Sequence, residues 1–99
     1  MMEFPRLSSK EAQILEALRG QEMFGLQLVQ ASRGQLKRGT VYVTLGRMQE
    51  KGFVESRLED RQPGAIGLPR RLYRANPFGV RVLDAWNTFR NTLAVVGAR

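Results

Sequence analysis

Residues 37–52 read KRGTVYVTLGRMQEKG, and this stretch decides the expected fold. An α-helix turns by about 100° per residue, so Val41, Leu45 and Met48 form one apolar, core-facing stripe. The opposite face carries short, hydroxyl-bearing and basic side chains, which suit contact with a nucleic-acid groove better than exposure to water alone. We therefore interpret the stretch as a recognition helix. Its outer face comprises Thr40, Val43, Gly46, Arg47 and Glu50, with Tyr42, Thr44 and Lys51 at the margins.

Composition limits the chemistry that the chain can perform. The chain has 99 residues, 42% of them hydrophobic and 25% charged, which is typical of one globular domain. Cysteine and histidine are both absent, so disulfides, thiolate nucleophiles and the commonest general base and metal ligand are missing. We expect no enzyme activity, no cofactor and no metal. No stretch resembles a secretory signal or a membrane span, so a cytoplasmic protein without a membrane partner is expected.

The net charge of +7 indicates an anionic partner, and its location is informative. Residues 33–74 carry ten Lys and Arg against four Asp and Glu, a net charge of +6. Residues 1–32 carry three basic and four acidic side chains, a net charge of −1. The basic excess therefore belongs to the predicted recognition helix and the segment after it, although a merely solvated basic surface is the alternative.

Two helices are predicted before the recognition helix. Ser8 and Glu11 have the spacing of a capping box, so the first helix should begin at Ser8 and end at Gly20. We expect its Glu11 and Glu16 to face solvent. A second helix covers roughly residues 24–32, where Gly25 indicates close packing against another helix. The basic, glycine-containing linker 32–39 then completes a helix-turn-helix.

A strand, a loop and a second strand follow Gly52. Residues 53–58 and 70–75 have strand character, with Leu72 and Tyr73 on opposite faces of the second strand. Residues 60–69, DRQPGAIGLP, contain two prolines and two glycines and must form a loop. This arrangement is a wing that can lie along the phosphate backbone or in the minor groove, with a solvated hairpin as the alternative. Its basic side chains are Arg57, Arg61, Arg70 and Arg71.

A long helix is predicted from Asn76, as its N-cap, to about residue 96. Its apolar residues follow a heptad spacing that a domain of this size cannot cover fully, so the outer turns should pair with a second copy in a two-fold dimer. The alternative is that the helix folds entirely onto its own core. The seam consists of Val82, Trp86, Phe89, Leu93 and Val96.

Three motifs in this order resemble the PadR-like winged helix-turn-helix transcriptional regulators of the short subfamily. They are MFGLQLVQAS (residues 23–32), GTVYVTLGRMQEKGFVESR (39–57) and PRRLYRANPFGVRVL (69–83). The resemblance implies a mainly α fold with a small β-wing. Residues 1–76 would form the winged helix-turn-helix domain and residues 77–99 the dimerisation helix. It also implies a cytoplasmic homodimer that binds a palindromic operator on double-stranded DNA, usually as a repressor.

Two groups of residues should divide the work of binding DNA. Basic side chains should supply affinity by neutralising phosphates. Side chains on the recognition helix should supply specificity, because methyl groups contact thymine and arginine can bond guanine. Tyr42 either packs on the core and sends its hydroxyl to a phosphate or only packs. The affinity residues are Lys37, Arg38, Arg47, Arg57, Arg61, Arg70 and Arg71, and the base-reading residues are Thr40, Val43, Thr44 and Arg47.

Two hypotheses remain open from the sequence. Trp86 is the single tryptophan, and drug-sensing members of the family suggest a small aromatic effector at the dimer interface, whereas ordinary dimer packing is the alternative. The winged fold could also be a protein-interaction module without specific DNA binding. Steep weakening of binding by salt would distinguish DNA binding from that module.

Overall fold

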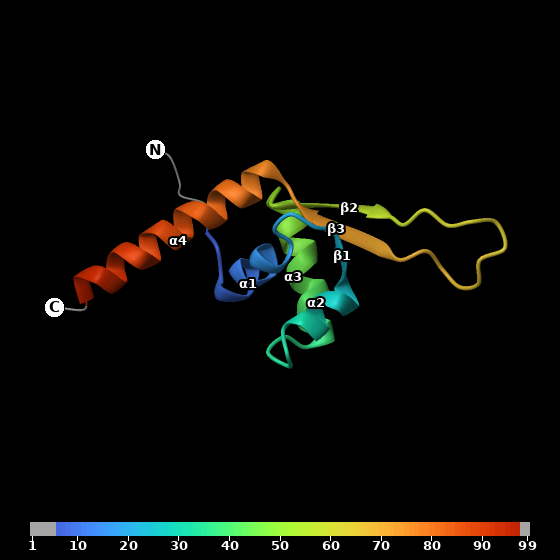
Figure 1. Ribbon diagram of the computed structural model, residues 1–99, viewed down its shortest axis with the longest axis horizontal. Helices are drawn as coiled ribbons and strands as arrows, with labels where there is room; N and C mark the ends of the chain where they lie inside the picture. Colours follow the sequence, from blue (N-terminus) through green and yellow to red (C-terminus); the bar gives the residue numbers. More distant parts are fainter. Residues whose placement is uncertain (1–5, 98–99) are drawn as a thin grey trace.

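Three short helices enclose the core, while a β-hairpin and a long helix extend from it in opposite directions (Figure 1). The computed structural model describes residues 6–97, with side chains for residues 6–94. The resulting shape is elongated, with extents of 61 × 33 × 22 Å. The elements are α1 (Ser9–Ala17), β1 (Met23–Phe24), α2 (Gly25–Ala31), α3 (Arg38–Glu50), β2 (Val54–Leu58), β3 (Arg71–Ala75) and α4 (Pro77–Gly97).

The core is built on the apolar stripe of α3. Val41, Leu45 and Met48 are 0% exposed, which confirms the predicted stripe. Helix α1 begins as predicted, because Ser8 accepts a hydrogen bond from the Glu11 amide and Glu11 accepts one from the Ser8 amide. The first half of α4 closes the core with buried Val82 and Leu83.

The three strands form one antiparallel sheet in the order β1-β3-β2. In β3, Tyr73 lies opposite Ser56 of β2 and Met23 of β1. Tyr73 is the buried residue of its strand, so its ring packs in the core. Strand β1 was not predicted, because two residues carry no periodic signal and pair only with a strand distant in the sequence.

The outer half of α4 leaves the core. Trp86 packs against the core with part of its surface, and its ring centroid lies 6.4 Å from that of Phe89. Phe89 and Leu93 are each 54% exposed, so the helix does not fold entirely onto its own core. The side chain of Val96, the last residue of the predicted seam, lies outside the described residues.

One junction joins α3, the wing and α4. Gly52 has a φ of +79°, which ends α3, and the Phe53 amide then donates to the Met48 carbonyl at 2.9 Å. The Phe53 carbonyl accepts from the Asn76 amide at 3.0 Å, and the Asn76 side chain accepts from the Gly79 amide at 2.8 Å as the predicted N-cap of α4. A β-carbon at Gly79 would overlap the Phe53 carbonyl oxygen.

Replacing Gly79 with alanine should therefore destabilise the protein. We expect Gly79→Ala to lower the free energy of unfolding by about 2–3 kcal/mol, because the backbone of Phe53 must move. Gly46→Ala is the matched control, since nothing lies within 4 Å of a β-carbon there. Alanine at 46 should add about 0.5–1 kcal/mol through helix propensity. Urea unfolding of both variants measures the difference, and equal stability would contradict the junction's importance.

Candidate nucleic-acid interface

The turn between α2 and α3 fixes the start of α3. The buried Ser32 hydroxyl donates to the Val29 carbonyl at 2.7 Å and accepts from the Leu36 amide at 3.0 Å. Helix α2 lies close to α3 because Gly25 leaves room for the Tyr42 ring, whose nearest atom would be 2.6 Å from a β-carbon. The predicted close packing of Gly25 is therefore confirmed. Tyr42 contacts Gly25 while 44% of its side chain stays exposed, so its packing is shown and a phosphate contact stays a prediction.

The outer face of α3 is exposed except at one predicted position. Val43 and Arg47 are exposed and Thr40 is half-buried. Thr44 is only 8% exposed, so the expectation that it lies at the margin of the outer face and is available to bases is wrong. Thr44 lies three residues after Val41 and therefore completes the core stripe. The exposed basic residues at the start of the same face are Lys37 and Arg38.

The first turn of α1 borders this face. A groove of about 650 Å³ runs between the two helices, with Ser8, Ser9 and Lys10 on one side and Thr40, Val43 and Arg47 on the other. The sequence showed where α1 begins, through its capping box, but not that this end lies beside α3. A duplex held against α3 would also meet the basic, hydroxyl-bearing start of α1.

An ion pair links α1 to the end of α3. Lys51 donates to the Glu11 carboxylate at 2.8 Å, and Glu11 is 3% exposed, so the expectation that it faces solvent is wrong. Burial raises the pKa of Glu11, but hydrogen bonds from Lys51 and Ser8 outweigh it and hold the pKa below its ordinary 4.5. The Glu11 carboxylate therefore serves both the N-terminal cap of α1 and the ion pair with Lys51. Helix periodicity alone cannot reveal such a contact between residues distant in the sequence.

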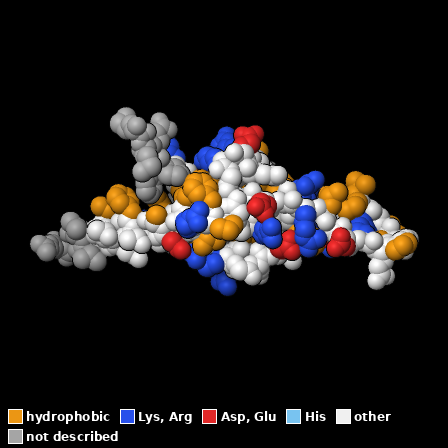
Figure 2. Space-filling view, turned by 90° about the horizontal axis from the view of Figure 1, so that it is seen from above, with side chains coloured by type: hydrophobic (Ala, Val, Ile, Leu, Met, Phe, Trp, Pro, Cys, Tyr) orange, Lys and Arg blue, Asp and Glu red, His pale blue; other side chains and the backbone are white. Residues whose placement is uncertain are grey.

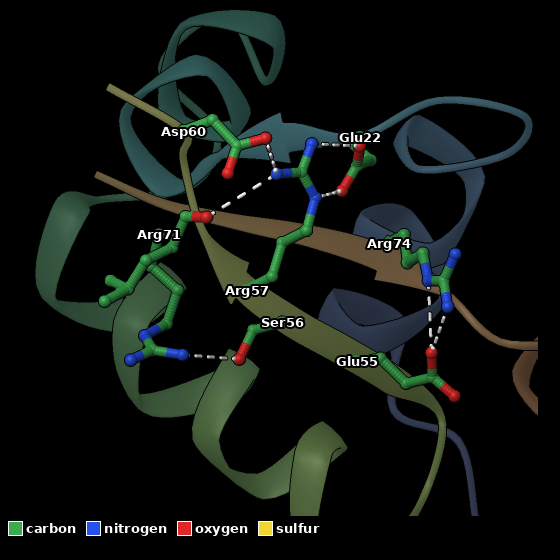
Figure 3. Close-up of polar contacts among 8 residues, drawn as sticks. Glu22, Glu55, Ser56, Arg57, Asp60, Arg71 and Arg74 are labelled. Carbon is green, nitrogen blue, oxygen red and sulfur yellow. Dashed lines mark hydrogen bonds and ion pairs between the residues drawn. The ribbon is translucent and has the colours of Figure 1, made fainter. Parts of the chain in front are cut away.

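Acidic or polar side chains engage the arginines of the two wing strands (Figure 3). Arg57 donates two hydrogen bonds of 2.9 Å to Glu22, which lies in the segment before β1. These hydrogen bonds lower the pKa of Glu22 and raise that of Arg57. Arg71 donates to the Ser56 hydroxyl at 3.1 Å, and Arg74 pairs with Glu55 at 2.7 Å. These two are exposed and sit on the strand pair itself.

The other two predicted wing arginines hold the loop together. Arg70 pairs with Glu59 at 3.2 Å, which lowers the pKa of Glu59, and its guanidinium lies 3.9 Å from the centre of the Phe24 ring. Arg61 is half-buried and donates to the carbonyls of Ile66 and Gly67. The arginines of the hairpin thus stabilise its loop in addition to making it basic.

The cations of α3 differ from those of the wing. Within residues 6–94, no ion pair involves Lys37, Arg38 or Arg47, whereas Arg57, Arg70 and Arg74 each have an acidic partner. The positive charge of α3 is therefore the more available to an anionic partner. In the part of the chain that is described, no cluster of acidic side chains could hold a metal ion. No helix there is long and apolar enough to cross a membrane.

Comparison with known proteins agrees with this architecture. The model of the transcriptional regulator PadR-like family matches residues 14–85. A comparison with curated proteins gives no significant match. Among solved structures, a PadR family transcription regulator from Clostridium difficile superposes with a TM-score of 0.75 at 24% identity, covering 86% of this chain and 90% of that one.

Two further solved structures share the fold. A PadR family regulator from Eggerthella lenta gives a TM-score of 0.73 at 24% identity and covers 88% of this chain and 76% of that one. Bacillus subtilis PadR, solved in complex with operator DNA, gives 0.71 at 20% identity and covers 80% of this chain and 47% of that one. The predicted mainly α fold with a β-wing is thus confirmed.

The shared carboxylate of Glu11 should make stability depend on pH. Because its pKa is lowered in the folded state, its contribution is complete above 4.5 and is lost as the pH falls through the folded pKa. Glu11→Gln should lower the free energy of unfolding by about 1–3 kcal/mol at neutral pH and much less in acid. Thermal unfolding from neutral to acidic pH measures this. Glu16→Gln, an exposed neighbour, is the control, and a pH-independent loss for Glu11→Gln would contradict the prediction.

Proposed function

Because this chain belongs to the PadR-like family of transcriptional regulators, we propose that it binds double-stranded DNA and places α3 in the major groove. The family consists of regulators and not of enzymes, in keeping with a chain that has no cysteine or histidine. The B. subtilis relative was solved on operator DNA, which supports the same class of partner here.

The exposed face of α3 carries this proposal. Its stripe is held in the core by three side chains that are 0% exposed, so the opposite face has a fixed orientation. Thr40 and Val43 present methyl groups that suit the thymine methyl, and Arg47 can bond guanine from the same face. Because Thr44 is buried, base reading is assigned to these three residues. Lys37 and Arg38 would neutralise phosphates at the groove edge.

The wing would contribute differently from α3. Arg71 is exposed beside Ser56, and Arg57 and Arg70 must rearrange their acidic contacts before they can bind phosphate fully. We therefore propose that Arg57 and Arg70 contribute less to DNA affinity than the cations of α3. Arg61 would affect DNA binding mainly by fixing the conformation of the wing loop, whose backbone it binds.

A homodimer through α4 would present two copies of α3. The exposed Phe89 and Leu93 follow Val82 and Trp86 at heptad spacing, and burying them requires a partner helix. Residues 77–99 would be the dimerisation segment, although Val82 and Leu83 also belong to the core. Two recognition helices related by a two-fold axis fit a palindromic operator with half-sites about 34 Å apart. Repression in the cytoplasm is the expected outcome.

A small aromatic effector at that interface is a further part of the proposal. A groove of about 680 Å³ is lined by Trp86 and Phe89 and by the Lys51–Glu11 pair at one side. Ordinary packing of a second α4 in this groove is the alternative. Titrating the dimer with flat aromatic compounds while recording tryptophan fluorescence distinguishes the two, because Trp86 is the single tryptophan.

DNA binding should depend steeply on salt. Affinity for a mixed-sequence duplex should fall about a thousandfold between about 50 and 200 mM salt if the dimer neutralises six or more phosphates. Arg47→Ala should weaken binding by about 1–3 kcal/mol per site. Arg19→Ala is the control, because Arg19 pairs with Asp84 of α4 and lies outside the α3 groove. Fluorescence anisotropy measures both, and a flat salt response would refute DNA binding.

Loss of the exposed seam should break the dimer. Phe89→Ser combined with Leu93→Ser should yield a folded monomer at micromolar concentration, because both side chains are half-exposed and lie in the outer half of α4. Asn91→Ser, on the opposite side of the same turns, should leave the dimer intact. Analytical ultracentrifugation distinguishes the two states. An unchanged dimer in the double variant would place the interface elsewhere.

A further inference from the structure

The end of the wing exposes large apolar side chains. Ile66 is 95% exposed and Leu68 is 88% exposed, more than the other exposed large hydrophobic residues among those described. Figure 2 shows hydrophobic side chains gathered toward the far end of the hairpin, with charged side chains on the strands behind them. Exposing two such side chains together costs solubility, so a partner that covers them is expected.

The loop that carries these residues has a defined structure. At its base, Arg70 donates its amide to the Glu59 carboxylate at 3.0 Å, and Glu59 donates its amide to the Arg70 carbonyl at 2.8 Å. At its end, the Arg61 guanidinium donates to the Ile66 and Gly67 carbonyls, the latter at 2.7 Å. Arg61 therefore ties the start of the loop to the backbone that bears the exposed side chains.

Three observations favour nucleic acid as the partner. The hairpin and α4 extend in opposite directions from the core, so the seam of α4 does not bring the wing end into the proposed dimer interface (Figure 1). Residues 57–71 carry four arginines against two acidic residues, a net charge of +2, which suits a polyanion. The hairpin also follows directly from α3, so the wing is attached to the proposed DNA-binding helix.

We propose that Ile66 and Leu68 form an apolar wedge that enters a flexible base step from the minor groove. This inference rests on the proposed DNA binding. Leucine and isoleucine are among the side chains that partly unstack base steps and kink a duplex. Steps such as TA unstack easily, whereas A-tracts are stiff, so a wedge favours operators that contain flexible steps beside the recognised bases. Arg61 is a positioning residue for the wedge.

The experiment compares two duplexes of about 30 base pairs, each labelled at both ends for energy transfer, one with central TA steps and one with an A-tract. The full-length protein should bind the TA duplex at least about tenfold more tightly and shorten its end-to-end distance. Ile66→Ser with Leu68→Ser should lose the preference and the bending but keep the salt dependence. Ile66→Leu with Leu68→Ile, which keeps the apolar character, should retain both effects.

Each of the other possible outcomes refutes either the wedge alone or the proposed DNA binding together with the wedge. If the serine variant bends and discriminates like the unaltered protein, the wedge is wrong. If the serine substitutions instead change the sedimentation of the free protein, the wing end binds a second copy and the wedge is also wrong. A protein that binds both duplexes with a steep salt response but without preference or bending refutes the wedge alone. Failure to bind either duplex refutes the proposed function, and the wedge with it.

Discussion

The carbonyl of Phe53 is the point on which the arrangement of the molecule depends. It accepts the Asn76 amide and lies against the backbone of Gly79, while the Phe53 amide completes the end of α3. The backbone of one residue thus ties α3, the strands of the wing and the first turn of α4 together. Because this contact admits no β-carbon at Gly79, it sets the direction in which α4 leaves the core. The spacing of two recognition helices in a dimer would follow from that direction.

Electrostatics separate the parts that extend from this junction. The cations of α3 have no ion-pair partner among the described residues, whereas the arginines of the hairpin bind acids, a hydroxyl or loop carbonyls. Exposed pairs of this kind contribute little to stability, so their main effect is to hold the hairpin's shape and reduce its free charge. Helix α3 would then provide most of the electrostatic attraction to DNA, and the wing would contribute mainly through the fixed shape of its hairpin.

Local signals in the sequence predicted local structure well. The stripe of Val41, Leu45 and Met48 and the capping residues Ser8 and Asn76 were recognisable because helix periodicity and caps act within a few residues. Family membership and the winged fold followed from motifs in a fixed order. The division of the chain at residue 76 and the assignment of individual DNA contacts remain predictions.

Most of the errors concern residues that meet across the fold. Thr44 is the exception: we expect it at the margin of the outer face with its methyl group reading bases, but it lies three residues after Val41 and is buried. Glu11 was placed in solvent, although Lys51, 40 residues later, draws it inward. The partner of Arg57, Glu22, and strand β1 likewise depend on tertiary contacts that no local pattern contains. Such pairings decide which arginines remain available to a ligand.

The central claim is that α3 reads bases as one of two symmetric copies. Selecting bound duplexes from a random-sequence pool with the full-length protein, and again with Arg47→Ala, tests it most directly. The account predicts an enriched inverted repeat whose half-sites are about one helical turn apart, with specificity relaxed by the variant at one position in each half-site. Enrichment of no motif, of a single asymmetric site, or of the same motif with undiminished specificity in Arg47→Ala would contradict it.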